Sequence, residues 1–322
     1  MRGEPLVTAV DSQSYSDRKV LVTGANGFLG RHVLQAFDLP PSQLLKPSSR
    51  DLDLTDANAV LQFFENNGVS HVVHLAAACG GIASNIEQPA HFLHANTMMG
   101  LNLLEGARRN ACQKFLLVST TCAYPEQAPM PLCEDSLWNG LPTSATRAYG
   151  LAKRFLHEAV IQYEHQYGLK GSVLIPANLY GPGDHYDERS HVVAALIKRY
   201  VDAHEKNLLS VTNWGTGTAT REFLYVADAA RAIALATFDL HHSTPVNLGT
   251  GVETSIKELA GLIAQLVAYK GALSWDSSKP TGQPRRSLNV ERAKRFGFTA
   301  EVDLESGLMR TIEDYRNRFI LS

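Results

Sequence analysis

Two polar side chains, Tyr149 and Lys153, lie four residues apart in the segment Tyr149-Gly150-Leu151-Ala152-Lys153. In a helix this spacing places both on one face, one turn apart. A tyrosine hydroxyl, with an unperturbed pKa of about 10, is a poor acid or base at neutral pH, but a neighbouring ammonium stabilises its phenolate. The pair therefore predicts proton transfer to a carbonyl oxygen, with the hydroxyl of Thr120 completing the hydrogen bonds around it.

The spacing of this pair is common on surface helices, so the prediction depends on a glycine-rich turn upstream. Gly24, Gly27 and Gly30 stand in Gly24-Ala25-Asn26-Gly27-Phe28-Leu29-Gly30, between a β-rich run at 19–23 and a helical pattern through Phe37. Gly24 and Gly27 permit a tight turn and close approach of a pyrophosphate, and Gly30 lets the helix pack close to the sheet. The spacing differs from GxGxxG, but between a strand and a helix it predicts a dinucleotide site.

The type of dinucleotide depends on the residues that follow the second strand. An acidic residue there binds the ribose 2′-hydroxyl of NAD, whereas an arginine accommodates the 2′-phosphate of NADP. The segment 46–51 ends in Arg50-Asp51, and the guanidinium of Arg50 suits a bidentate phosphate contact. We therefore predict NADP(H), and we expect Asp53 to face the adenine or to cap the next turn.

Strands alternate with helices along the first half of the chain, which predicts an α/β fold of Rossmann type with a doubly wound parallel sheet. We expect the segments 221–236 and 246–248 to return to this sheet, and residues 254–322 to combine two or three helices with one short strand. The resulting expectation is a flexible leader at 1–18, an NADP-binding domain at 19–178 and 222–248, and a smaller, mixed α/β substrate-binding domain at 179–221 and 249–322.

Composition excludes several other classes of protein. Of the 322 residues, 44% are apolar and 19% are charged, which is ordinary for a globular chain, and the net charge of -2 predicts no nucleic-acid or membrane partner. The four cysteines form no CxxC pair, so we expect neither a disulfide scaffold nor a bound metal. The polar start of the chain and the absence of a long apolar stretch predict a cytoplasmic protein.

The chain resembles the extended short-chain dehydrogenases/reductases and, more narrowly, the GDP-L-fucose synthase family, from about Lys19 to Phe319. The motifs that carry the resemblance are Gly80-Gly81-Ile82, Thr120-Thr121-Cys122-Ala123-Tyr124-Pro125, Asn178-Leu179-Tyr180-Gly181-Pro182, Ser190-His191, Trp214-Gly215, Arg221-Glu222-Phe223 and Lys279-Pro280 followed by Gly282. This family epimerises C3 and C5 of GDP-4-keto-6-deoxy-mannose and then reduces C4 with NADPH. The resemblance therefore implies an enzyme that is both an isomerase and an oxidoreductase.

The resemblance also assigns roles to individual residues. It implies that Cys122 and His191 are the acid/base pair of the epimerisation, and thiols and imidazoles do titrate within reach of neutrality. It implies that Arg199, Trp214, Arg221 and Lys279, together with Asn178, bind the nucleotide-sugar. We further expect the cofactor to contact Gly24, Asn26, Gly27, Phe28, Leu29, Gly30, Arg50, Asp53, Leu54, Leu75, Ala76, Ala77, Tyr149, Lys153, Pro176, Asn178, Leu179 and His191.

One departure leaves alternatives open. The family usually carries serine where this chain has Thr120, and the extra methyl group crowds the site. A relative that acts on another nucleotide-linked 4-keto sugar, such as a GDP-heptose or a CDP- or dTDP-deoxysugar, therefore remains an alternative. A non-catalytic NADP-sensing protein is a further alternative, although the Tyr/Lys pair disfavours it. Resemblance also implies a homodimer through the helices at 90–109 and 148–167.

Overall fold

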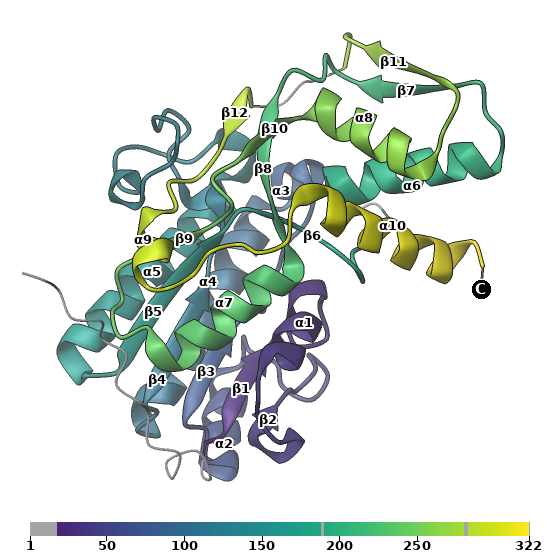
Figure 1. The fold of residues 1–322 in the computed structure, drawn as a ribbon. Helices are drawn as coiled ribbons and strands as arrows, with labels where there is room; N and C mark the ends of the chain where they lie inside the picture. Colours follow the sequence, from purple (N-terminus) through teal and green to yellow (C-terminus); the bar gives the residue numbers. More distant parts are fainter. Residues whose placement is uncertain (1–17, 188–189, 280–282, 322) are drawn as a thin grey trace, which may run out of the picture.

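The computed structural model describes residues 18–187, 190–279 and 283–321. Its main sheet has six parallel strands in the order β2-β1-β3-β4-β5-β9 (Figure 1). The strands are β1 Val20–Thr23, β2 Leu44–Leu45, β3 His71–His74, β4 Lys114–Val118, β5 Lys170–Pro176 and β9 Val246–Leu248. All residues of β1, β3, β4 and β9 are buried, as expected for parallel strands covered on both faces. The predicted fold class is confirmed.

Helices cover both faces of this sheet. On one face α1 packs against α7, and on the other α4 packs against both α2 and α5 (Figure 1). Asp56 caps α2 through the backbone N–H groups of Asn58 and Ala59, and the left-handed Gly68 ends that helix. The helices of this part are α1 Phe28–Ala36, α2 Ala57–Asn67, α3 Ile82–Glu87, α4 Pro89–Arg109, α5 Arg147–Tyr167 and α7 Val226–Asp239.

A second, smaller core lies beyond the carboxyl ends of the main strands, where α6, α8 and α10 pack together. Two small sheets accompany it, one with β8 between β10 and β12 and also paired to β6, the other with β7 and β11. The elements are β6 Asn178–Tyr180, α6 Val192–Glu205, β7 Ser210–Trp214, β8 Thr220–Tyr225, β10 Glu253–Ser255, α8 Ile256–Val267, β11 Ala272–Asp276, β12 Arg285–Arg286, α9 Glu291–Arg295 and α10 Leu304–Phe319.

One sequence-based expectation about the sheets is wrong. The strand that begins the segment 221–236 does not return to the main sheet, because β8 pairs with β6, β10 and β12. The helix that follows it, α7, does pack on the main sheet, and β9 pairs with β5 there. Among the residues that the structure describes between 254 and 321, there are three helices and two complete strands, β11 and β12, rather than one strand. The predicted domain limits stay a prediction, and the expected leader at 1–18 lies outside the described residues except for Arg18.

Candidate active site

The glycine-rich turn connects β1 to α1 at the point where the strand order changes direction, because β2 lies on one side of β1 and β3 on the other. Gly24 has a left-handed backbone with a φ of +70°, and a Cβ atom there would lie 2.8 Å from the backbone nitrogen of Ala76. A Cβ atom at Gly30 would lie 2.2 Å from the carbonyl oxygen of Gly24. Only glycine fits either position. The turn therefore carries no side chain at these two points, and its backbone lies close to the loop after β3.

The first turn of α1 fits a bound pyrophosphate. No side chain caps the helix at Gly27, and its first turn contains no acidic residue. Its first N–H groups and the positive end of the helix dipole therefore face a site suited to an anion. Arg50 is exposed in the turn after β2 and forms no ion pair with any residue that the structure describes, which fits a contact with a 2′-phosphate. Asp53 accepts hydrogen bonds from the backbone N–H and hydroxyl of Thr55 at 2.8 and 2.7 Å, so it caps a turn, as expected.

Lys153 lies on α5 with its side chain 2% exposed, and its Nζ donates to the carbonyl oxygen of Val118 at 3.2 Å. This bond joins the middle of α5 to the end of β4, the strand that leads into Thr120. Burial of the ammonium lowers the pKa of Lys153 to about 8. Lys153 therefore lies beside the end of β4, and its catalytic role stays a prediction.

Tyr149, one turn before Lys153, differs from expectation in its electrostatics. Burial is the main reason that the pKa of Tyr149 is raised, and the neighbouring thiols Cys79 and Cys122 raise it further. The expected lowering of the Tyr149 pKa by Lys153 is therefore wrong. The raised pKa keeps the hydroxyl protonated, and a protonated tyrosine is the form that can donate to a carbonyl oxygen.

Two buried imidazoles that the sequence analysis missed lie around Lys153. His157, one turn after Lys153, hydrogen-bonds through Nε2 to the hydroxyl of Ser119, and His74 hydrogen-bonds through Nδ1 to the hydroxyl of Thr23 at 2.9 Å. Burial lowers the pKa of His157 to about 3 and that of His74 well below its ordinary value, and the charge of Lys153 adds to both shifts. Both rings are therefore neutral. The spacing of Lys153 and His157, four residues along one helix, was a signal available in the sequence.

Thr120 and Cys122 follow β4 in a short turn that packs against α5. The Thr120 side chain caps the 3-10 turn η3 (Thr121–Ala123) by accepting from the backbone N–H of Cys122 at 3.2 Å. A Cβ atom at Gly150 would lie 2.2 Å from the carbonyl oxygen of Cys122, so the helix backbone touches the turn. The thiol of Cys122 is half-buried and lies within electrostatic range of Tyr149. The structure thus brings Thr120, Cys122 and Tyr149 together.

Arg286 contributes a guanidinium to the same place and was not predicted. Its Nη1 donates to Cys122 Sγ at 3.9 Å and to the hydroxyl of Thr121 at 3.5 Å, and its Nη2 donates to Gln283 Oε1. Cys122 and Arg286 are 164 positions apart. The signal in the sequence was weak, because Arg286 belongs to a pair of adjacent arginines that follows the Lys279 motif.

His191 and the residues predicted to bind the nucleotide-sugar lie on the smaller core and its connections. His191 is exposed at the N-cap of α6, as expected, and Arg199 on that helix donates to the backbone and side chain of the β7 segment 212–213. Trp214 ends β7 with 66% of its surface exposed. The amide of Asn178 donates to the carbonyl oxygen of Glu222 at 2.9 Å. No contact in the structure joins His191 directly to Cys122, so their cooperation stays a prediction.

Comparison with known proteins places this arrangement in a family. Residues 20–249 match the model of the NAD dependent epimerase/dehydratase family. The chain belongs to this family. The match includes the glycine-rich turn, Cys122, Tyr149, Lys153 and His191, and it ends before the segment that carries Arg286.

Within the NAD dependent epimerase/dehydratase family, the chain is similar to GDP-L-fucose synthases over most of its length. It is 35% identical to the GDP-L-fucose synthase of Escherichia coli K12, covering 92% of this chain and 96% of the relative. It is also 35% identical to the GDP-L-colitose synthase of Yersinia pseudotuberculosis, covering 93% and 98%. The solved GDP-L-fucose synthetase of Naegleria fowleri bound to NADP is 27% identical, with a TM-score of 0.84 and coverage of 94% and 95%. The predicted resemblance is confirmed.

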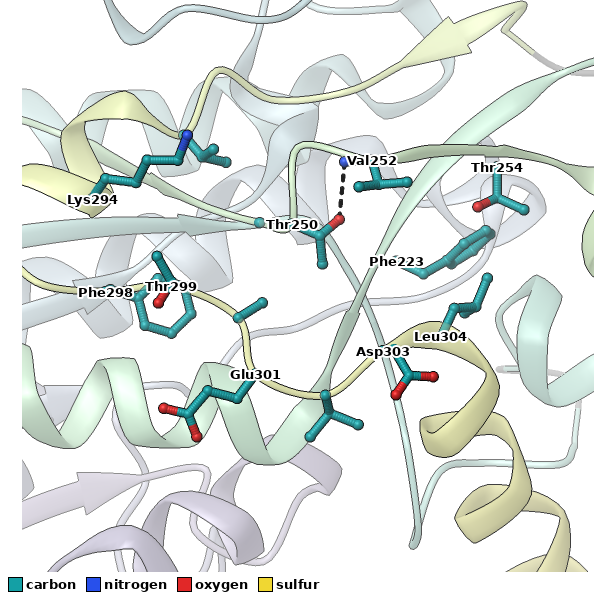
Figure 2. Close-up of a pocket in the computed structure, with 14 residues that line it drawn as sticks. Phe223, Thr250, Val252, Thr254, Lys294, Phe298, Thr299, Glu301, Asp303 and Leu304 are labelled. Atoms are coloured by element: carbon teal, nitrogen blue, oxygen red, sulfur yellow. Dashed lines mark hydrogen bonds between the residues drawn. The ribbon is translucent and has the colours of Figure 1, made fainter.

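A separate cavity of about 490 Å³ lies between β8, the loop after β9 and the segment that leads into α10. Figure 2 shows the aromatic rings of Phe223 and Phe298 at opposite parts of it, with Thr250 between them bonded to the backbone N–H of Val252. None of the residues that line this cavity was predicted to bind the cofactor or substrate or to act in catalysis. Lys294, which also lines it, forms an ion pair with Glu291. The cavity is therefore not the site built around Cys122. No helix in the described part of the chain is long and apolar enough to span a bilayer.

Proposed function

We propose that this chain is an NADPH-dependent enzyme that converts GDP-4-keto-6-deoxy-mannose to GDP-L-fucose, by epimerisation at C3 and C5 followed by reduction at C4. The proposal rests on one observation: side chains from α5 and from β12 converge on the turn that carries Cys122. Cys122 lies between α5, which presents Tyr149 and Lys153, and β12, which presents Arg286. Identities of 33–35% with bacterial GDP-L-fucose synthases over more than nine-tenths of this chain support the choice of reaction.

The epimerisation uses groups that a simple reductase does not need. The ketone at C4 acidifies the protons on C3 and C5, so a base on one face of the sugar removes a proton and an acid on the other face returns one. Cys122 and His191 supply these groups, because a thiol and an imidazole both exchange protons near neutral pH. The enolate oxygen that forms at C4 is held by the hydroxyls of Tyr149 and Thr120.

The reduction uses the other half of the site. NADPH, when bound along the glycine-rich turn, supplies a hydride to C4. Tyr149 donates its hydroxyl proton to the C4 oxygen, and its raised pKa keeps it protonated until that moment. The Lys153 ammonium, held by the Val118 carbonyl, stabilises the phenolate that the donation leaves behind. The pKa of about 8 keeps most of Lys153 charged at neutral pH.

Recognition of the nucleotide-sugar falls to the smaller core. Arg221 on β8 is partly buried and has no ion-pair partner among the described residues, which suits a diphosphate. Trp214 presents an exposed indole on which a guanine or ribose stacks. Arg199 and Lys279 add cations, although Arg199 already donates to Asn213 and would exchange that bond for the ligand.

A second substrate deserves direct comparison because one relative favours it. The GDP-L-colitose synthase of Yersinia pseudotuberculosis is as similar to this chain as the Escherichia coli fucose synthase is. Its name implies a sugar that differs from fucose by a deoxygenated carbon. Thr120 carries an extra methyl group beside the place proposed for the reacting carbons, so it is the residue that we expect to influence the choice between the two sugars.

Product identification tests the proposal. The protein is incubated with NADPH and, in parallel, GDP-4-keto-6-deoxy-mannose, the corresponding 3,6-dideoxy sugar, a GDP-heptose and dTDP- or CDP-linked 4-keto sugars, and products are assigned by NMR. We expect GDP-L-fucose from the first substrate, with kcat/KM at least ten times that for the others. Faster turnover of another sugar would replace the substrate assignment, and NADPH binding without any turnover would support a sensor.

Variants separate the two halves of the reaction. Cys122→Ser should abolish exchange of the C3 and C5 protons into deuterated water without NADPH, and Tyr149→Phe should abolish NADPH oxidation but leave exchange measurable. Cys133→Ser is the matched control, because Cys133 is also half-buried and its thiol donates to Glu134 and Asp135 rather than facing Tyr149. Normal exchange in Cys122→Ser would remove that residue from the mechanism.

We also propose a homodimer through α4 and α5. These helices pack together over one face of the sheet, and they expose Leu93 with 44% and Phe155 with 48% of their surfaces free. Four helices from two copies would cover both side chains. The double variant Leu93→Glu/Phe155→Glu should sediment as a monomer, whereas Leu209→Glu, at a side chain 89% exposed elsewhere, should not change the mass. A wild-type monomer at micromolar concentration contradicts the proposal.

A further inference from the structure

The contact between Arg286 and Cys122 joins the two parts of the molecule at the reacting thiol. Arg286 lies on β12 of the smaller part, and Cys122 lies on the turn after β4 of the main sheet. The Nη1 group reaches both Cys122 Sγ at 3.9 Å and the Thr121 hydroxyl at 3.5 Å. The Nη2 group donates to Gln283, whose amide donates in turn to Thr143 beside the start of α5. The guanidinium is therefore held in place by neutral partners.

The charge of Arg286 has no carboxylate to balance it among the residues that the structure describes. Its register partner on β8 is Arg221, a second cation, and the charge of Arg286 adds to burial in lowering the pKa of Arg221. Like charges at adjacent strand positions destabilise a sheet. The guanidinium groups of Arg221 and Arg286 therefore lie side by side without a carboxylate partner among the described residues. Such a pair of cations suits a site that binds anions.

The neighbouring residue shows what an arginine does on this strand when it has a structural role. Arg285 has 55% of its side chain exposed, and it forms an ion pair with Glu253 on β10. Its charge is satisfied within the smaller part. Arg286 differs because its one sulfur contact is the thiol that the proposed reaction uses.

We propose that Arg286 acts in the epimerisation by stabilising Cys122 as a thiolate. The inference rests on the proposed function, because it deepens the role of Cys122 in that reaction. A guanidinium beside a sulfur favours the thiolate over the thiol, and the thiolate is the form that accepts a proton from carbon. Arg221 then remains available to bind the diphosphate of the substrate. Arg286 would thus interact with the Cys122 thiolate, and Arg221 with the diphosphate.

The proton-transfer step balances with the groups present. The Cys122 thiolate forms an S–H bond as the C–H bond next to the C4 ketone breaks, and the electron pair of that bond moves to the C4 oxygen as an enolate. Return of a proton to carbon from His191 on the opposite face inverts the centre and regenerates the ketone. Arg286 keeps its proton throughout, so it stabilises charge and does not transfer it.

Other ionisable groups around Cys122 come from each neighbouring element. Tyr149 on α5 lies within electrostatic range of both Cys122 and Cys79, and Lys153, one turn further along α5, lies within range of Cys79. Arg154 on α5 donates to the carbonyl oxygen of Ala123 beside Cys122, and Arg221 on β8 adjoins Arg286. Arg154 donates to the carbonyl oxygens of Ala123 and Gly140, and the Nζ of Lys153 donates to the carbonyl oxygen of Val118. Arg286 is therefore the cation whose removal should change the ionisation of Cys122.

Peptide-resolved alkylation tests the proposal without substrate or cofactor. The protein is treated with iodoacetamide from pH 5.5 to 10, and the rate at each cysteine is followed by mass spectrometry, so that half-buried Cys133 serves as an internal reference. In Arg286→Met we expect the midpoint of the Cys122 profile to rise by at least one pH unit, with that of Cys133 unchanged. Arg286→Lys should restore part of the shift, and Arg285→Met should cause none.

Solvent exchange then connects the shift to the reaction. If Cys122 needs one more pH unit to ionise, Arg286→Met should exchange the C3 and C5 protons about ten times more slowly at pH 7 and recover toward the wild-type rate at high pH. An unmoved alkylation midpoint with a raised KM for the GDP-sugar would overturn the proposal and make Arg286 a substrate ligand. A shifted midpoint without turnover on any keto-sugar would leave the effect of Arg286 on Cys122 standing, but it would refute the proposed function and with it the role in epimerisation.

Discussion

Replacing Gly150 by alanine tests whether the reaction depends on close contact between α5 and the turn that carries Cys122. A Cβ atom at this position would lie 2.2 Å from the Cys122 carbonyl oxygen and 3.2 Å from Pro142 Cβ. Ordinary contact begins near 3.4 Å, so the helix and the turn must separate by roughly 1 Å. The first obstacle is backbone, so no side-chain rotation relieves it. Tyr149, the adjacent residue, must move away from Cys122 with the helix.

A shift of this size predicts large losses in both half-reactions. Misplacement of reacting groups by about 1 Å costs on the order of 100-fold in rate, so we expect exchange and NADPH oxidation to fall by that factor. Overpacking should lower the free energy of unfolding by about 1–3 kcal/mol, despite a helix-propensity gain of about 1 kcal/mol for alanine. NADPH affinity should also fall in a titration, because Tyr149, which we expect to contact the cofactor, moves with the helix.

Gly261→Ala is the matched control. Gly261 also lies inside a helix, α8, but no atom lies within 4 Å of the position its Cβ would take. We expect this variant to keep full activity and to unfold at slightly higher urea concentration. A folded Gly150→Ala protein with wild-type rates of both exchange and reduction would refute the reasoning, because the separation of α5 from the Cys122 turn would then have no consequence.

Three further predictions follow from single groups. Burial lowers the pKa of Lys153 to about 8, so NADPH oxidation should decline as pH rises through 8, and a plateau to pH 9.5 would contradict a role for the ammonium. His71 and His157 stay neutral when folded, with pKa lowered to about 4 and about 3, whereas the unfolded chain binds protons near pH 6.5. The free energy of unfolding should therefore fall by about 1.4 kcal/mol per pH unit for each histidine as pH drops from 6 to 4.5, and urea titrations of His157→Phe should show a slope smaller by one proton. Arg50→Ala should raise the KM for NADPH about 10- to 100-fold with little effect on NADH, and equal losses for both would show that Arg50 does not select the phosphate.

The parts of the site that were predictable are those with a local signature. Gly24 and Gly30 mark the turn after β1 because the close approaches they allow, to Ala76 and to the Gly24 carbonyl, need glycine in any sequence that forms this turn. Tyr149 and Lys153 are readable because their spacing matches the helical period. These signals predicted the parallel sheet, the dinucleotide site and one face of the active site.

The parts that were not predictable depend on packing between distant segments. Nothing in the residues of β8 distinguishes a return to the main sheet from pairing with β6, β10 and β12, since both positions bury an apolar strand. The approach of Arg286 to Cys122 depends on that pairing, because β12 is positioned by β8. The electrostatics of Tyr149 was mistaken for a similar reason, because helix spacing predicts proximity to a charge but not the extent of burial.

The segment 181–184, which leads toward His191, is held from two sides. Arg31 and His32 on α1 donate to its carbonyl oxygens, both at 2.8 Å. From the other side, Asp314 on α10 accepts from a backbone N–H of the segment at 2.9 Å, and Arg318 donates to one of its carbonyl oxygens at 3.2 Å. The segment thus connects the helix that follows the glycine-rich turn with the last helix of the smaller core.

The connection between the two parts of the molecule fixes the positions of the proposed catalytic residues relative to the glycine-rich turn. Tyr149 and Cys122 take their positions from the main sheet, whereas His191 and Arg286 belong to elements of the smaller core. Because α1 begins at the glycine-rich turn and bonds directly to the 181–184 segment, one helix connects the proposed cofactor turn to that segment. The Arg286–Cys122 contact provides a second connection at the opposite end of the site. The two parts of the molecule are therefore joined at two places, through α1 at the 181–184 segment and through Arg286 at Cys122.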